Sequence, residues 1–154
     1  MREHRGIRLT LLILQAFVAL TSFAGGVALV IGSIDASFST VLNPPPEYLA
    51  GSPFDSYVVP GLVLAVVIGG GHAFAFVQLE RRMPRALFAA AAAGFATLIW
   101  IFVQMMIIPF SVLQAVYFAI GLAELGLVLL LLEVLGRPAP RHSPARSKSR
   151  LSAQ

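Results

Sequence analysis

Four long apolar runs restrict this chain to a membrane-spanning fold. They cover residues 9–34, 58–79, 86–108 and 112–135, and each is at least as long as the ~20 residues that cross a bilayer core as a helix. Hydrophobic residues make up 58% of the chain and charged residues only 12%, about half the charged share of a soluble domain. The sequence therefore predicts an all-α membrane domain over residues 1–136, an up-down bundle of four transmembrane helices.

The first run competes with a secretory signal peptide, because Ser22-Phe23-Ala24 resembles a small-residue cleavage site. The apolar run continues past this point to residue 34, however. It is about 26 residues long, whereas the apolar core of a signal peptide has roughly 7–15. We therefore expect an uncleaved first helix.

The basic residues indicate the orientation. All 11 lie in the N-terminal segment, in the turn between the second and third runs, or after the fourth run. Four spans place these three segments on one side, which the positive-inside rule assigns to the cytoplasm. The many Arg, Ala, Gly and Pro residues are typical of a GC-rich bacterial genome. We therefore expect a multi-pass protein of the bacterial plasma (inner) membrane, with cytoplasmic N- and C-termini.

Residues 137–154 are rich in Pro, Ser and Arg and contain almost nothing apolar. Such a segment buries too little surface to offset its ordering entropy, so we expect a disordered basic cytoplasmic tail. The net charge of +4 then reflects topology, and we expect no nucleic-acid partner. Contact of the tail with anionic lipid is the alternative role for its charges.

The longest connection, residues 35–57, contains acidic and aromatic residues but no Lys or Arg. We expect it to cap the outer end of the bundle, with a binding lid as the alternative. Residues 47–50 fit one helical turn, with Pro46 just inside its start. Ser56 is the predicted N-cap of the second helix, and Ser111 with Gln114 forms a capping box for the fourth.

Small residues recur every four positions on three of the helices and predict close contacts with a neighbouring helix, another membrane protein or a second copy. The predicted helix-packing residues are Gly61, Ala65, Gly69, Ala73, Ala90, Gly94, Ala115, Ala119 and Ala123.

Glu124 lies near the middle of the fourth run, where a carboxyl group is costly and should turn inward. Counting inward from the outer helix ends at 1.5 Å per residue places Glu124 at roughly 20 Å and His72 at roughly 21 Å. The same count reaches Thr21 or Ser22 on the first helix, and leaves Gln15 nearer the cytoplasmic face. The predicted intramembrane polar site therefore contains His72, Glu124, Thr21 and Ser22.

This polar layer has three interpretations. It is a hydrogen-bonded pair that fixes helix register, a protonation or ligand site, or a carboxyl that faces a partner subunit. Catalysis is not indicated, because the chain has no nucleophile–base spacing, no metal cluster such as H-E-x-x-H and no cofactor motif. We therefore expect no enzyme activity, no cofactor and no metal. The chain also has no cysteine, which excludes thiol chemistry.

Three features resemble a family of small, uncharacterised four-span bacterial membrane proteins. They are the Gly25-Gly26 pair, residues 52–61, and Trp100 followed by Gln104. In that family a similar Pro-Phe-x-x-Tyr-x-x-Pro-Gly segment leads into the second helix. The resemblance implies a four-helix plasma-membrane protein and implies no activity.

Two functions remain open. The first is a non-enzymatic structural or accessory subunit that packs against another membrane protein or itself, which the small-residue faces favour. The second is a small proton-linked carrier or channel that uses the His72/Glu124 layer. Because four helices alone rarely enclose a pathway, we expect the second function to require an oligomer.

Overall fold

Four helical rods run up and down in the computed structural model, which describes residues 2–136. Each rod is long and apolar enough to cross a membrane, so the predicted all-α bundle of four spans is confirmed. The elements are α1 (Arg2–Ile34), α2 (Ala36–Leu42), η1 (Pro46–Leu49), α3 (Val58–Leu62), η2 (Val63–Gly69), α4 (Gly70–Glu80), α5 (Ala86–Ile107) and α6 (Val112–Gly136). The predicted disordered tail, residues 137–154, lies outside the described residues.

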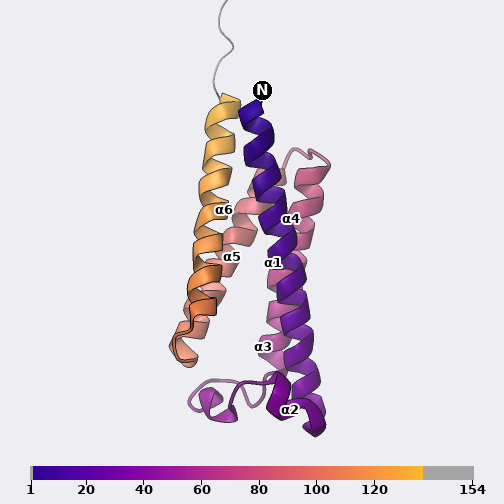
Figure 1. The fold of residues 1–154 in the computed structure, drawn as a ribbon, viewed down its shortest axis with the longest axis vertical. Helices are drawn as coiled ribbons and strands as arrows, with labels where there is room; N and C mark the ends of the chain where they lie inside the picture. The colour runs from indigo at the N-terminus through magenta and orange to yellow at the C-terminus, as the bar shows by residue number, and fades with distance from the viewer. Residues whose placement is uncertain (1, 137–154) are drawn as a thin grey trace, which may run out of the picture.

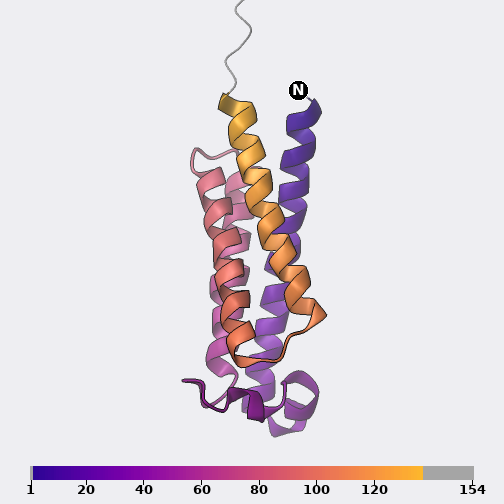
Figure 2. The same cartoon turned by 90° about the vertical axis from the view of Figure 1, so that its left-hand side faces the viewer.

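The two ends of the bundle differ in charge (Figures 1 and 2). The start of α1, the α4–α5 turn and the end of α6 lie together at one end. We call it the basic end, because it carries Arg5, Arg8, Arg81, Arg82 and Arg85. The other end, which we call the loop end, carries α2 and η1.

At the basic end the first span is tied to the second. Arg8 Nη2 of α1 donates hydrogen bonds to Leu79 O at 2.9 Å and to Glu80 O at 2.8 Å. These carbonyls belong to the last turn of α4, where backbone oxygens have no partner inside the helix. Arg8 therefore caps α4 and also contributes to the charge that predicts orientation.

The second span is one continuous rod with a π-helical middle. The short helix α3 leads into η2, a π-helix over Val63–Gly69, and α4 follows. The Gly70 N–H bonds back to Ala65 O, a spacing of five residues. Segments of this type are rare and frequently occur at functional sites. Here the π-helix ends one turn before His72.

Glycines let this rod cross α1 closely. A Cβ added to Gly61 would lie 2.7 Å from Gly26 O, and one added to Gly69 would lie 3.1 Å from Phe23 N. Ala65 is buried between them. Ala73 is exposed, so its predicted packing role within this chain is wrong. Ala73 lies beyond the π-helix in α4, whose buried residues are His72, Ala75 and Leu79. An α-helix has 3.6 residues per turn, so an every-four pattern drifts away from the contact there.

The small residues of the third and fourth spans also include both buried and exposed positions. Ala90 and Gly94 are buried, whereas Ala115, Ala119 and Ala123 are exposed, so their predicted contact within this chain is wrong. Among the α6 residues whose burial is described, the buried ones are Gln114, Gly121, Glu124, Val128 and Leu131. This spacing of three, four and seven follows the seam of antiparallel bundles, from which an every-four stripe drifts away.

The connection at the loop end is more ordered than the sequence indicates. Asp35 accepts a hydrogen bond from Ser37 N at 2.9 Å and caps α2, a helix that the sequence did not predict. The predicted helical turn is the 3₁₀ turn η1. Ser56 is not the N-cap, because α3 begins after Tyr57. The Ser111–Gln114 capping box is confirmed, with reciprocal bonds of 2.8 and 3.3 Å.

Tyr57 fastens this connection to the bundle. Its hydroxyl donates to Pro45 O at 2.8 Å. Burial raises the pKa of this phenol, and the neighbouring Tyr48 and Glu47 raise it further. The hydroxyl therefore keeps its proton, and its hydrogen bond, at neutral pH.

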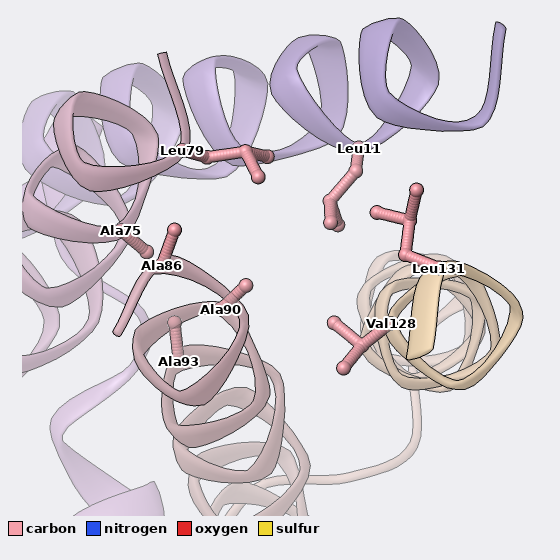
Figure 3. Packing of buried hydrophobic residues seen from close by; sticks show 8 residues of the cluster. All are labelled: Leu11, Ala75, Leu79, Ala86, Ala90, Ala93, Val128 and Leu131. Atoms are coloured by element: carbon pink, nitrogen blue, oxygen red, sulfur yellow. The ribbon is translucent and has the colours of Figure 1, made fainter. Parts of the chain in front are cut away.

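An apolar cluster fills the bundle toward the basic end (Figure 3). It joins four helices through Leu11, Ala75, Leu79, Ala86, Ala90, Ala93, Val128 and Leu131. The alanines let α4 and α5 approach closely, and the leucines of α1 and α6 fill the remaining space. The polar site lies on the loop-end side of this cluster.

Candidate intramembrane polar site

His72 of α4 and Glu124 of α6 meet inside the bundle. Their side chains are 0% exposed, and Nε2 of His72 lies 3.1 Å from Oε2 of Glu124. The predicted inward orientation of Glu124 therefore holds, and the third interpretation, a carboxyl turned outward toward a partner, is wrong. Both helices run from the loop end toward the basic end, so counting inward from their starts placed both residues at one level.

The hydrogen bonds of His72 indicate where its protons lie. Nδ1 is 2.7 Å from the backbone oxygen of Ile68, and a carbonyl oxygen can only accept. Nδ1 therefore carries a proton and donates it. Nε2 then either accepts from a protonated Glu124 or donates to an ionised one. In both cases one proton lies in the hydrogen bond between the two side chains.

Thr97 of α5 completes the contact in place of Thr21 and Ser22. Its Oγ1 lies 3.4 Å from His72 Nε2, and the residue is 1% exposed. Thr21 instead donates to Phe17 O of its own helix at 2.7 Å. Ser22 is buried, but its Oγ has no hydrogen-bond partner among the described residues. The structure thus joins His72 and Glu124 and leaves the two predicted α1 hydroxyls outside the pair.

Gln15 belongs to this layer, although the sequence placed it nearer the basic end. Figure 3 shows Leu11 of α1 pointing toward Val128 and Leu131 of α6. The two helices are antiparallel, so one turn from Leu11 to Gln15 matches one turn back from Val128 to Glu124. The depth count failed because it began at residue 34, whereas α1 extends beyond the other spans at the loop end (Figure 1).

Several buried atoms of the layer lack partners. Within the described part of the chain, neither Oε1 nor Nε2 of Gln15 has one, nor does Oε1 of Glu124. An unpaired buried polar group costs about 1–3 kcal/mol. A layer that served only to fix register would gain stability from pairing these atoms. Their open positions instead suit water, a proton carrier or a polar ligand.

A cavity of about 260 Å³ lies between this layer and the loop end. Ser22 and Thr97 line its inner part, and Gln104, Ser111 and Pro44 line its outer part. Thr97 is therefore both a wall of the cavity and a neighbour of His72 Nε2. Toward the basic end lies the apolar cluster of Figure 3.

A second, smaller cavity brings together residues from the sequence features that suggested a family. Phe54, Tyr57 and Pro60 line this space of about 90 Å³ with Trp100 and Gln104. The glycine of the same segment, Gly61, meets Gly26 at the crossing with α1. These residues therefore form one packed region at the loop end.

No protein-family model, curated protein or solved structure matches this chain. The resemblance to small four-span bacterial proteins stays a prediction. The site must therefore be interpreted from its own geometry.

The geometry suits proton exchange or ligand binding better than metal binding. Among the described residues, no group of three or more His, Cys, Asp or Glu side chains lies close enough to hold a metal. A carboxyl and an imidazole that share a proton can exchange it with water or a solute in the cavity. Thr97 and Gln15 were not predicted as site residues from the sequence. Each is a polar residue on an otherwise apolar helix face, and this pattern could have indicated both.

Proposed function

We propose that this chain is a non-enzymatic, multi-pass protein of a bacterial plasma membrane whose bundle carries a protonation site reached from the outer face. The observation that carries the proposal is the buried His72–Glu124 pair, which contacts Thr97 on the wall of a cavity at the loop end. A small proton-linked carrier or channel is the function that this arrangement supports best.

The charge distribution supports this orientation. Among residues 2–136, the arginines lie at the basic end, and the 35–57 connection has no Lys or Arg. The positive-inside rule assigns the basic end, and with it both termini, to the cytoplasm. The cavity then opens toward the outer face, and the apolar cluster forms the cytoplasmic barrier.

Glu124→Gln is the decisive substitution. The amide keeps the shape of the carboxyl and can still hydrogen-bond to His72, but it cannot exchange a proton. In proteoliposomes that contain a pH-sensitive dye, we expect this variant to fold normally and to lose proton flux at least about tenfold. Glu124→Leu should lose flux and also about 1–3 kcal/mol of stability, because His72 Nε2 loses its carboxyl partner and keeps only the 3.4 Å contact with Thr97.

Glu80→Gln is the matched control, because Glu80 is an exposed carboxyl at the basic end. Its proton flux should equal that of the unchanged protein. If Glu124→Gln also keeps the full flux and stability, the pair serves only to fix helix register, and the protonation site does not exist.

A second candidate is a structural or accessory subunit, favoured by one observation. Ala115, Ala119 and Ala123 form a small-residue stripe on α6 that is exposed in this chain and would admit another helix closely. Native electrophoresis in mild detergent tests this proposal. Ala119→Phe should dissociate a complex that Leu132→Phe, at an exposed position about 100° or more around the helix from the stripe, leaves intact. A single monomeric species for all three proteins would reject a subunit role through this face.

A further inference from the structure

The cavity beside the polar layer is larger than a proton path requires. It follows α5 from Thr97 to Ile108, about 16 Å at 1.5 Å per residue. Its volume of about 260 Å³ is several times the ~30 Å³ that one water occupies in the liquid. The cavity is long, and its middle part is lined by Leu64, Ile68 and Ile101. This shape and lining suit one extended, largely apolar molecule.

Two buried polar atoms on residues that line the cavity require a partner. Ser22 Oγ and Trp100 Nε1 are buried without one among the described residues. Ser22 is 3% exposed. An indole N–H can only donate a hydrogen bond, so its partner must be an acceptor. A serine hydroxyl can donate to the same kind of group.

The lining also selects against charge. The residues around the cavity include no Lys, Arg, Asp, Glu or His. An ionised group would lose its hydration there without gaining an opposite charge. The occupant that fits is uncharged.

We propose that this cavity binds an uncharged, single-chain amphiphile whose carbonyl oxygen accepts hydrogen bonds from Ser22 and Trp100. The carbonyl lies at the inner end near Thr97, and the hydrocarbon chain extends toward Ile108 and the loop end. This inference rests on the proposed function, because it names the class of solute that reaches the protonation site. Water alone is the competing occupant.

Trp100 provides the readout, because it is the only tryptophan in the chain. The probe is 5-bromoundecan-2-one, whose bromine lies three bonds from the carbonyl carbon and so close to Trp100 in the proposed pose, since bromine quenches indole fluorescence on contact. It is titrated into the full-length protein in lipid nanodiscs. Specific binding gives saturable quenching, whereas partition into lipid gives quenching that rises linearly with probe concentration.

Two variants alter the cavity and one serves as a control. A Cβ at Gly25 would lie 3.5 Å from Leu64 Cδ2, an ordinary contact, so Gly25→Leu should place its side chain in the cavity. Ser22→Ala removes only the unpartnered hydroxyl and should fold even where the larger change does not. Gly126→Leu is the control, because an added Cβ there meets nothing within 4 Å among the described residues.

We expect saturable quenching in the unchanged protein and in Gly126→Leu. Gly25→Leu should abolish the saturable component, and Ser22→Ala should weaken probe affinity several-fold. Linear quenching that is the same in all four proteins would overturn the proposal and leave water as the occupant. The flux assay with Glu124→Gln separates the two claims. If the unchanged protein shows a proton flux that Glu124→Gln loses, but no saturable probe binding, only the solute class is rejected. If the unchanged protein shows neither flux nor saturable binding, the protonation site is rejected as well.

Discussion

Glu124 and Gln15 are two buried side chains at one level of the bundle, and they differ in how many of their polar atoms have hydrogen-bond partners. Glu124 pairs one carboxyl oxygen with His72 and leaves the other without a partner among the described residues. Gln15, level with Glu124 on α1, pairs neither of its polar atoms in that same part of the chain. In a low-dielectric interior such groups lower stability. We interpret this loss of stability as the cost of a functional site.

Replacing Gln15 tests that interpretation at the residue scale. Gln15→Leu removes two unpaired polar atoms and keeps a similar volume. We expect the free energy of unfolding in detergent to rise by about 1–3 kcal/mol, while proton flux falls. Gln78→Leu, at a half-buried position near the basic end, should change stability by less than about 0.5 kcal/mol. A loss of stability in Gln15→Leu would mean instead that the amide is paired in the folded protein.

The depth of the site could be predicted from the sequence, but its composition could not. Residue counting gives height along a helix, and short turns fix relative heights, so His72 and Glu124 were placed together. Counting does not give the direction in which a side chain points. Thr21 bonds to a backbone oxygen of its own helix, and Ser22 Oγ has no partner among the described residues. Thr97, by contrast, contacts His72 from a third helix.

At the scale of elements, the contact between α1 and the second span organises the bundle. The backbones meet at Gly26, Gly61 and Gly69, where a side chain would collide with the opposite helix. This contact also holds the π-helix η2 against α1 and so fixes the turn that presents His72. A local change at the crossing should therefore affect both packing and the polar site.

Two glycines on the second span give opposite expectations. A Cβ at Gly61 would lie 2.7 Å from Gly26 O, whereas one at Gly70 meets nothing within 4 Å among the described residues. Gly61→Ala should destabilise the bundle by about 1–3 kcal/mol through overpacking. Gly70→Ala should stabilise it by about 0.5–1 kcal/mol, because alanine is the better helix former. Thermal unfolding in detergent measures both, and equal effects would reject the close crossing.

The spans were predictable because long apolar runs have one solution in a bilayer. The π-helix was not, since its residues read as ordinary apolar helix. The stripe of Ala115, Ala119 and Ala123 also misled the prediction. Small residues indicate where a helix can be approached, but the contacts of α6 within this chain follow a seven-residue seam through Gly121 and Glu124.

At the scale of the whole molecule, the interior of the bundle differs between its two ends. The cavity occupies the loop-end half, and the apolar cluster fills the basic-end half. If the basic end faces the cytoplasm, the proposed protonation site would exchange protons with the outer side only. A response to pH on one side of the membrane only, here called sidedness, therefore distinguishes a protonation site from a buried pair that only fixes helix register.

One measurement tests this sidedness directly. Infrared difference spectra are recorded on right-side-out vesicles, and the carboxyl band of Glu124 is assigned by its loss in Glu124→Gln. A pH step applied to the outer solution should change that band within the time of mixing, and Thr97→Val should slow the change. The same step applied to the inner solution should leave the band unaltered at first. A band that responds to neither solution would contradict a protonation site reached from the outer face.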